Sequence, residues 1–244
     1  MKDLSWLKHD FIAHRGFHNQ NLNILENTKE AFEYALQKEF SIECDLNMLK
    51  DGTVVVFHDK NLNRLCSVDK DLKDLSIHEI RNIRLKDKKS SIITLEELIQ
   101  IVKGKKPLLI ELKPFNNPKI FVDRVMDVLK DYHGPYALFS FHPMIVYQLK
   151  KKYPHVIRGQ ISSFYKEDTM NPIARMVLKR MWLNLLTKPD FISYHNKDLP
   201  NKYATRFYRK KGVVISFVAQ TEKEFTRIRS LYHNVVFEHF EPKK

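Results

Sequence analysis

The chain has 244 residues, of which 43 % are hydrophobic, so it is long enough to fill one large core. Its net charge of +13 comes from lysines and arginines scattered along the chain, without a long basic run or zinc-finger spacing, which argues against nucleic-acid binding. Two cysteines without metal-ligand spacing, and no apolar segment of signal-peptide or membrane-spanning length, suit a reducing compartment. We expect one cytoplasmic domain over residues 1–244.

The first predicted strand is the short apolar run of residues 11–14, which ends in His14. A polar loop follows. The next helix is predicted to begin at Asn27 as N-cap, with Glu30 three residues later as the partner of a capping box. The order of elements therefore opens with a strand and a helix.

Residues 40–59 predict two strands joined by a tight turn at Asp51-Gly52. The second strand is expected to run back antiparallel and to bring His58 roughly opposite Asp45. A half-exposed hairpin with a solvated polar face is the alternative interpretation of this stretch.

Glu43 and Asp45 lie on the first of these strands and, because side chains alternate, on the same face. Buried carboxylates have to be paired or to bind a cation. Oxygen ligands without a thiolate cluster favour Mg²⁺, Ca²⁺ or Mn²⁺ over Zn²⁺. The hairpin is therefore a candidate site for one divalent cation.

After a charged connection, Thr94 is predicted to cap a helix with apolar residues on one face. Residues 107–114 then form a nearly continuous apolar run, which is typical of a parallel strand covered on both sides. Near its end stand Glu111 and Lys113, which alternation places on the same face. Charged side chains at the end of an apolar strand indicate a functional site.

The remaining chain continues to alternate between strand and helix patterns. Strands are predicted near residues 11, 41, 107, 136, 156, 190, 213 and 235. Eight such strands close a TIM-type (β/α)8 barrel. The strand at 53–58 is left out of this count, because a two-residue turn cannot connect parallel neighbours, and is expected as an extra hairpin strand at the catalytic mouth.

Residues 173–186 form an amphipathic segment rich in Met, Leu, Lys and Arg, and include Trp182. A packed peripheral helix is the favoured interpretation. A lid or a membrane-surface contact is the alternative.

In such a barrel the chemistry lies at the carboxyl ends of the strands. The charged residues there are His14, Arg15, Glu43, Asp45, Glu111 and Lys113. Three carboxylates can hold one divalent cation, while Arg15 and Lys113 supply positive charge for a phosphate. His14 and His58 could then act as general acid and base, because imidazole titrates near neutral pH.

The same residues form a series of motifs, which resembles that of the glycerophosphodiester phosphodiesterase family. In chain order the motifs are His14-Arg15-Gly16, Glu26-Asn27-Thr28, Glu43-x-Asp45, Asp51-Gly52 leading to His58-Asp59, and Glu111-x-Lys113. Later stretches at residues 158–160 and 188–191 look like the compact bacterial members. The resemblance spans nearly the whole chain.

The resemblance implies a metal-dependent phosphodiesterase of lipid and glycerol metabolism, a hydrolase that converts glycerophosphodiesters to sn-glycerol 3-phosphate and an alcohol. It also implies roles for the residues: Glu43, Asp45 and Glu111 as metal ligands, His14 and His58 as the acid/base pair, Arg15 and Lys113 on the phosphate, and Glu26 as a loop organiser. Phe217 would replace the tryptophan that usually lines the substrate pocket, which puts the preferred alcohol in question.

Two alternatives stay open. A lysophospholipase D-like phosphodiesterase would also have to house an acyl chain, and the 173–186 segment and basic surface are compatible with it. A non-catalytic barrel that binds an anionic membrane would gain nothing from three converging carboxylates. The expected partner is thus a small glycerophosphodiester, with no nucleic acid and at most peripheral membrane contact. The sequence also leaves open which histidine is the base, and whether water or the glycerol hydroxyl attacks phosphorus.

Overall fold

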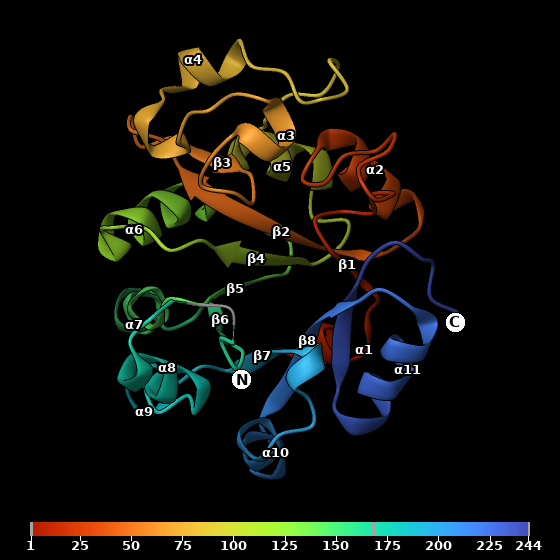
Figure 1. Ribbon diagram of the computed structural model, residues 1–244, viewed down its shortest axis with the longest axis vertical. Helices are drawn as coiled ribbons and strands as arrows, with labels where there is room; N and C mark the ends of the chain where they lie inside the picture. Colours follow the sequence, from red (N-terminus) through yellow and green to blue (C-terminus); the bar gives the residue numbers. More distant parts are fainter. Residues whose placement is uncertain (1, 167–168, 244) are drawn as a thin grey trace. The chain divides into compact units, whose positions relative to one another are not determined.

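Strands and helices alternate along the chain in the computed structural model, which describes residues 2–166 and 169–243 (Figure 1). The strands are β1 Ile12–Ala13, β2 Ser41–Met48, β3 Val54–Val56, β4 Leu108–Leu112, β5 Tyr136–Ser140, β6 Ile157–Ser162, β7 Phe191–His195, β8 Val213–Ala219 and β9 Asn234–Phe237. Their order in the sheet is β1-β9-β8-β7-β6-β5-β4-β2-β3, with β1 also paired to β2. The predicted TIM-type (β/α)8 barrel with an extra strand is confirmed.

Apart from α1, which precedes β1 and was not predicted, the helices fall between the strands. They are α1 Ser5–His9, α2 Lys29–Gln37, α3 Asn63–Cys66, α4 Ile77–Arg81, α5 Leu95–Val102, α6 Pro118–Leu129, α7 Pro143–Lys152, α8 Pro172–Lys179, α9 Asn184–Thr187, α10 Lys202–Arg209 and α11 Glu222–Leu231, with short 3₁₀ turns at Leu72–Asp74 and Asn196–Asp198. No helix in the described parts of the chain is long and apolar enough to cross a membrane.

The caps of two helices test the sequence patterns. Thr94 caps α5 through a capping box with Glu97, as predicted for Thr94. The predicted cap Asn27 is wrong, because Thr28 accepts the hydrogen bond from the Ala31 N–H and caps α2. Asn27 has a left-handed backbone, with φ of 56°, and its side chain is bonded to Asp45 instead.

The chain divides into two compact units. Ala13–Tyr136 contains β2, β3 and β4, and we call it the β2–β4 unit. Met1–Ile12 and Ala137–Lys244 contain β6 to β9 and nearly all of β5, and we call them the β5–β9 unit. The single domain predicted for residues 1–244 stays a prediction.

In the β2–β4 unit, every residue of β2 is buried, and β2 runs parallel to β4 with Asp45 opposite Glu111. β3 runs antiparallel to the end of β2, where Leu46 pairs with Val56 and Met48 with Val54. The extra strand therefore lies beside the carboxyl end of β2.

The turn between β2 and β3 differs from the predicted two-residue turn. The Gly52 N–H bonds the Leu49 carbonyl and the Leu49 N–H bonds the Thr53 carbonyl, so three residues form the loop. Gly52 has a φ of 87°, the left-handed conformation that closes such a loop and favours glycine. The extra residue shifts the register by one: the Phe57 N–H, and not that of His58, bonds the Asp45 carbonyl.

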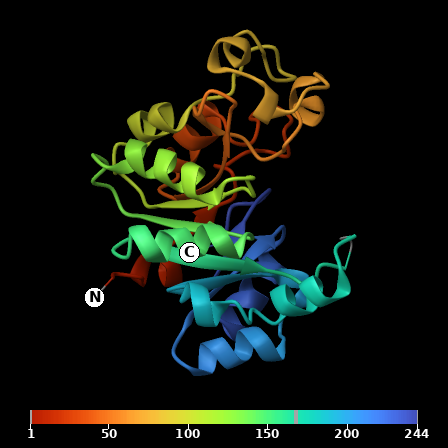
Figure 2. The same cartoon turned by 90° about the vertical axis from the view of Figure 1, so that its left-hand side faces the viewer.

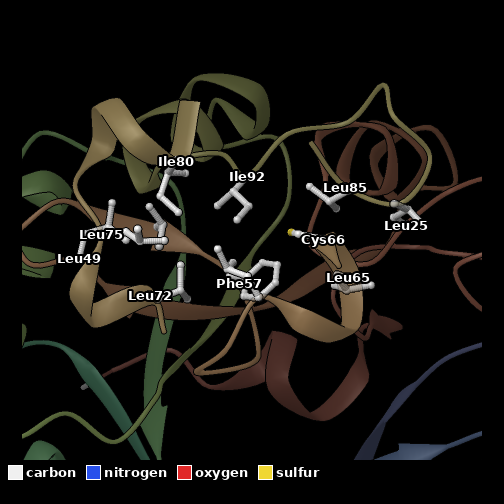
Figure 3. Close-up of a cluster of buried hydrophobic side chains, with 12 residues drawn as sticks. Leu25, Leu49, Phe57, Leu65, Cys66, Leu72, Leu75, Ile80, Leu85 and Ile92 are labelled. Carbon is white, nitrogen blue, oxygen red and sulfur yellow. The ribbon is translucent and has the colours of Figure 1, made fainter. Parts of the chain in front are cut away.

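A hydrophobic cluster covers β3 and the segment that follows it. Figure 3 shows Phe57, Leu72, Leu75, Ile80 and Ile92 pointing toward one another, with Leu49 from the end of β2 beside them. All of these side chains are buried. The cluster fixes the chain at Phe57, and thus the position of His58 directly after it.

In the β5–β9 unit, strands β5 to β9 are parallel, and each pairs with the next along the chain. Gly159 on β6 is required by packing, because a Cβ there would overlap the Phe191 ring. Helix α9 lies beside α7, where Lys150 Nζ donates to the Leu186 carbonyl at 2.6 Å. The α8 helix lies at the margin of the unit (Figure 2).

Candidate active site

Three buried carboxylates meet at the ends of β2 and β4. Glu43 and Asp45 come from β2 and Glu111 from β4, and one oxygen of each lies within 4.8 Å of the others. The in-register pairing of Asp45 with Glu111 brings this about, because directly opposite residues of neighbouring strands point to the same face. The structure therefore brings together the three predicted metal ligands.

Two positively charged side chains, Lys113 and Arg15, form ion pairs with these carboxylates. Lys113 Nζ lies 2.8 Å from Asp45 Oδ1 and 3.0 Å from Glu111 Oε1. Arg15 Nε lies 3.2 Å from Asp45 Oδ2, and the Arg15 backbone N–H donates to Glu43 Oε2 at 3.0 Å. Both predicted phosphate-binding residues thus lie in the cluster.

The electrostatics differ among the three acids. Burial, with repulsion from Asp45 and Glu111, raises the pKa of Glu43 well above its usual value. Burial also raises the pKa of Asp45, but Lys113 and Arg15 outweigh it and hold that pKa well below its usual range. The pKa of Glu111 is raised by burial, which exceeds the opposing effect of Lys113. Negative charge at Glu43 and Glu111 is therefore under-compensated.

These residues fit a divalent cation. The donor set is three buried carboxylates without a thiolate, which suits Mg²⁺, Ca²⁺ or Mn²⁺. Glu111 Oε1 is buried and accepts no hydrogen bond of good geometry, although Lys113 Nζ lies 3.0 Å away. A cation between the carboxylates would coordinate this oxygen, and its charge would stabilise the ionised forms of Glu43 and Glu111, whose pKa values are raised.

The two predicted acid/base histidines also lie at this cluster. His14 follows β1, and its Nε2 is 3.9 Å from Glu43 Oε2. His58 follows β3, and its Nδ1 is 2.6 Å from Asp59 Oδ1. Positive charge on either histidine lowers the pKa of Asp45, so both rings are close enough to act on the same carboxylate.

Behind the histidine and the arginine lies a second network, which the sequence did not assign. Arg64 Nε donates to Asp59 Oδ2 at 2.6 Å, and Arg64 Nη2 donates to Glu26 Oε1 at 2.6 Å. Glu26 also accepts from Arg15 Nη1 at 2.6 Å. Arg64 thereby connects His58, through Asp59, with Arg15, through Glu26.

Glu26 is the centre of this network. Although burial raises its pKa, hydrogen bonds and charge from Arg64 and Arg15 lower it to about 2. Asn21 holds the loop before Glu26 by accepting from its backbone N–H and donating to its carboxylate. This matches the loop-organising role that the resemblance implies for Glu26.

Three polar residues here had no role assigned from the sequence, although Asn27 and Asp59 stand in its motifs. Asn27 Nδ2 donates to Asp45 Oδ2 at 2.9 Å, Asp59 bonds His58 Nδ1, and Arg64 donates to Asp59. The residue type of Asn27 could have indicated its position, because Asn is one of the few residues that tolerate a left-handed backbone. In that conformation its side chain bonds Asp45 and does not cap the helix. Arg64 had no local signal, since an arginine on a short helix is usually solvated.

A cavity of about 320 Å³ opens beside the ends of β2 and β4. It is lined by Asn47, Met48, Lys60, Asp71, Leu72, Lys73, Pro114, Phe115 and Asn116. Its volume is in the range of small-molecule sites.

Phe217, the predicted pocket residue, belongs to the β5–β9 unit. It lies on β8, and its ring centroid is 5.7 Å from that of Phe141 and 5.4 Å from that of His195. Its role in a substrate pocket stays a prediction.

The similarity to known proteins covers the residues of this site. The family model for glycerophosphoryl diester phosphodiesterases matches residues 14–217. A glycerophosphodiester phosphodiesterase of Caldanaerobacter subterraneus is 28 % identical over 160 residues, 61 % of this chain and 64 % of its own length. Human lysophospholipase D GDPD1 is 30 % identical over 135 residues, 50 % of this chain and 41 % of its own length. The chain thus spans less than two thirds of either relative.

Solved structures share the fold. A phosphodiesterase of Oleispira antarctica, in complex with the product sn-glycerol-3-phosphate, has a TM-score of 0.80 and 20 % identity over 96 % of this chain and 94 % of its own. A glycerophosphodiester phosphodiesterase of Thermotoga maritima has a TM-score of 0.72 and 25 % identity over 94 % of each chain. Because the family model matches residues 14–217, which include every residue of the site, the chain belongs to the glycerophosphoryl diester phosphodiesterase family.

Proposed function

We propose that this protein hydrolyses glycerophosphodiesters to sn-glycerol 3-phosphate and an alcohol, with one divalent cation as cofactor. The observation that carries the proposal is the meeting of three buried carboxylates with Arg15, Lys113 and two histidines. Carboxylates repel a phosphate unless a cation lies between them. A site that only bound anions would have no use for them.

Glu43, Asp45 and Glu111 are the proposed metal ligands. When bound, Mg²⁺, Ca²⁺ or Mn²⁺ would supply Lewis-acid stabilisation of charge on phosphoryl oxygens. Asn27 orients Asp45 by donating to Oδ2 and accepting from its backbone N–H. Lys113 offsets part of the repulsion between Asp45 and Glu111 when no cation is bound.

Arg15 and Lys113 are proposed to contact the phosphate. Their charges are held in place by carboxylates on the protein side: Glu26 accepts a hydrogen bond from Arg15 Nη1, and Asp45 forms ion pairs with Arg15 and Lys113. Such held cations need little reorganisation when an anion binds, which is the condition for effective stabilisation of a phosphoryl group. Burial lowers the pKa of Lys113, but the charges of Asp45 and Glu111 raise it further, so the ammonium stays protonated.

His14 and His58 are proposed to transfer the protons. One ring removes a proton from the attacking oxygen, and the other gives a proton to the leaving alkoxide of the alcohol, so the two changes balance. Asp59 bonds His58 at Nδ1, which leaves Nε2 as the nitrogen available to substrate. We place the alcohol portion in the cavity beside Asn47 and Pro114.

The direct test is hydrolysis of glycerophosphocholine, followed as released sn-glycerol 3-phosphate. Activity should need an added divalent cation, disappear with a chelator, and disappear in Glu43→Gln. Ser216→Ala, a buried polar change on β8 in the other unit, is the matched control and should retain activity. Metal-independent release, or equal loss in both variants, would contradict the proposal.

A lysophospholipase D-like activity is the second candidate. The human relative is named a lysophospholipase D, and the α8–α9 segment exposes apolar side chains. A faster reaction with lysophosphatidylcholine than with glycerophosphocholine, lost in the same Glu43→Gln variant, would favour this candidate. The predicted cytoplasmic location stays a prediction.

A further inference from the structure

Five apolar side chains are exposed on one short stretch of the β5–β9 unit. They are Ile173, Met176, Trp182, Leu185 and Leu186, half of the ten exposed large hydrophobic residues in the described chain. Leu185 is 87 % exposed and Ile173 68 %. We call these five residues the α8–α9 patch.

The patch is unusual because its main helix contributes nothing to the core. Helix α8 has no buried residue, whereas α7 in the same unit buries Ile145, Val146 and Leu149. Nevertheless α8 is held in place through its last turn, where Ser162 Oγ and the Tyr194 hydroxyl bond the carbonyls of Leu178 and Lys179. The predicted packed peripheral helix is thus found only in part: Val177 and Leu178 are half-buried and the helix is anchored at its last turn, while Ile173 and Met176 are exposed to solvent.

The segment that carries the patch has charge of a single sign, although acidic residues flank it in the sequence at positions 167, 168 and 190. Residues 169–189 contain four basic residues, Arg175, Lys179, Arg180 and Lys188, and no acidic one. Three further lysines, Lys150–Lys152, end α7, and Lys150 Nζ bonds the Leu186 carbonyl of the patch. An apolar face with a basic rim complements an anionic surface that also has an apolar interior.

We propose that the α8–α9 patch docks on an anionic lipid bilayer, with the five apolar side chains at the boundary of head groups and acyl chains and the basic residues on the head groups. Trp182 fits this position, because indole favours the membrane interface. The Arg180 guanidinium lies over the Trp182 ring at 5.2 Å, so cation and ring can enter the interface together. The proposal does not depend on the proposed reaction.

Trp182 also supplies the probe. The chain has two tryptophans, and Trp6 is buried at 8 % exposure. In a Trp6→Phe background the emission comes from Trp182 alone. Vesicles of phosphatidylcholine mixed with phosphatidylglycerol should shift this emission to the blue, and phosphatidylcholine vesicles should not. No shift with either vesicle, or equal shifts with both, would overturn the proposal.

Co-sedimentation with the same anionic vesicles tests the residues. The double variant Ile173→Gln/Leu185→Gln should lose most of the bound fraction, whereas Leu22→Gln, an equally exposed leucine in the other unit, should not. Arg180→Gln should weaken binding about fivefold, since each basic residue near an anionic surface contributes about that factor. These variants replace exposed side chains, and an unchanged far-ultraviolet circular dichroism spectrum and Tm check the fold independently of any activity.

A second copy of the chain is the competing occupant of the patch. In sedimentation velocity, the wild-type protein should not self-associate through the patch, so it and the Ile173→Gln/Leu185→Gln variant should sediment alike. An association of this kind, with no binding of the wild-type protein to anionic vesicles, would overturn the bilayer as partner. Binding to vesicles that the double variant retains would also overturn the patch as the docking surface.

Discussion

The two units differ in what their strands bury. In the β2–β4 unit the buried polar side chains include Glu26, Glu43, Asp45, Glu111 and Lys113, which carry charge. In the β5–β9 unit the strands bury mainly small or neutral polar side chains, among them Ser140, Gln160, Ser162, Ser193 and Ser216. The one buried charge on its described strands is Arg158 of β6, whose guanidinium donates to the Lys188 carbonyl and lies 3.7 Å from Asp190 Oδ2. Both sets are compatible with a closed sheet, since a buried serine can bond a neighbouring carbonyl, as Ser216 Oγ does with that of Tyr194 at 2.7 Å and Ser162 Oγ with that of Leu178 at 3.0 Å.

This difference in buried charge shows that some site residues of the β2–β4 unit lower the stability of the fold. Burying like charges costs several kcal/mol per ion unless partners compensate, and Glu43 and Glu111 are only partly compensated. No carboxylate lies on the described strands of the β5–β9 unit, and the buried Arg158 there is compensated by backbone carbonyls and Asp190. The β2–β4 unit thus carries buried carboxylates that could hold a cation, whereas the strands of the other unit carry none.

Replacing a carboxylate in the charged unit should have the largest effect. Glu43→Gln or Glu111→Gln should lower kcat by about 100- to 1000-fold, because each change removes a group that fixes charge in the site. Steady-state hydrolysis of glycerophosphocholine measures this. An activity within a factor of two of wild type would remove the chemical distinction between the units.

Glu26→Gln should cost roughly 3 kcal/mol of unfolding free energy at neutral pH, because the folded pKa lies near 2 and the usual value is 4.5. A lowered carboxyl pKa contributes stability that is present above the unfolded pKa and is lost as pH falls through the folded value. The difference between variant and wild type should therefore shrink below about pH 4.5 and vanish near pH 2. Urea unfolding across this range measures it, and a difference independent of pH would argue against the charge of Glu26.

Metal removal should destabilise the protein at neutral pH. The raised pKa of Glu43 means that stability present below its unfolded pKa is lost as pH rises through the folded value, because the ionised form is opposed by burial and by Asp45 and Glu111. A cation at 100 times its Kd should add about 2.7 kcal/mol. Tm should rise with Mg²⁺ or Ca²⁺ at neutral pH, and Glu43→Gln should be more stable than wild type in chelator. Equal Tm values for wild type with and without metal would contradict the site.

Loss of the partner of His58 should have an intermediate effect. Asp59→Asn keeps the size of the side chain but removes the charge that Nδ1 of His58 and Arg64 share. Residues that orient a functional histidine typically contribute 10- to 100-fold, so we expect about that loss in kcat with little change in KM. A change confined to KM would assign Asp59 to substrate binding instead.

Ser193→Ala tests the β5–β9 unit and should have the smallest effect. The Ser193 hydroxyl is buried and has no hydrogen-bond partner among the described residues. Removing it should leave unfolding free energy within about 0.5 kcal/mol or raise it slightly, and leave activity unchanged. Thermal unfolding and the same hydrolysis assay measure both. A loss near that of Glu26→Gln would mean that this unit also depends on its buried polar groups.

The sequence by itself determined the eight strands, the barrel and the cluster of His14, Glu43, Asp45 and Glu111, because these depend on local patterns. Apolar runs predict buried strands, and alternation places Glu43 and Asp45 on one face whatever the neighbouring strand is. Parallel pairing then puts the ends of the strands at one edge, so the charged residues there must meet.

Only the tertiary structure decided the details that depend on distant partners. The loop at Gly52 has three residues instead of two, and this shifted the register of His58. Asn27 does not cap the helix, because its side chain donates to the buried Asp45 carboxylate. Arg64 belongs to the site because the fold places Asp59 and Glu26 within hydrogen-bond distance of it. The apolar side of α8 looked like a packing face in sequence, since periodicity shows that a helix has such a side but not whether the fold covers it.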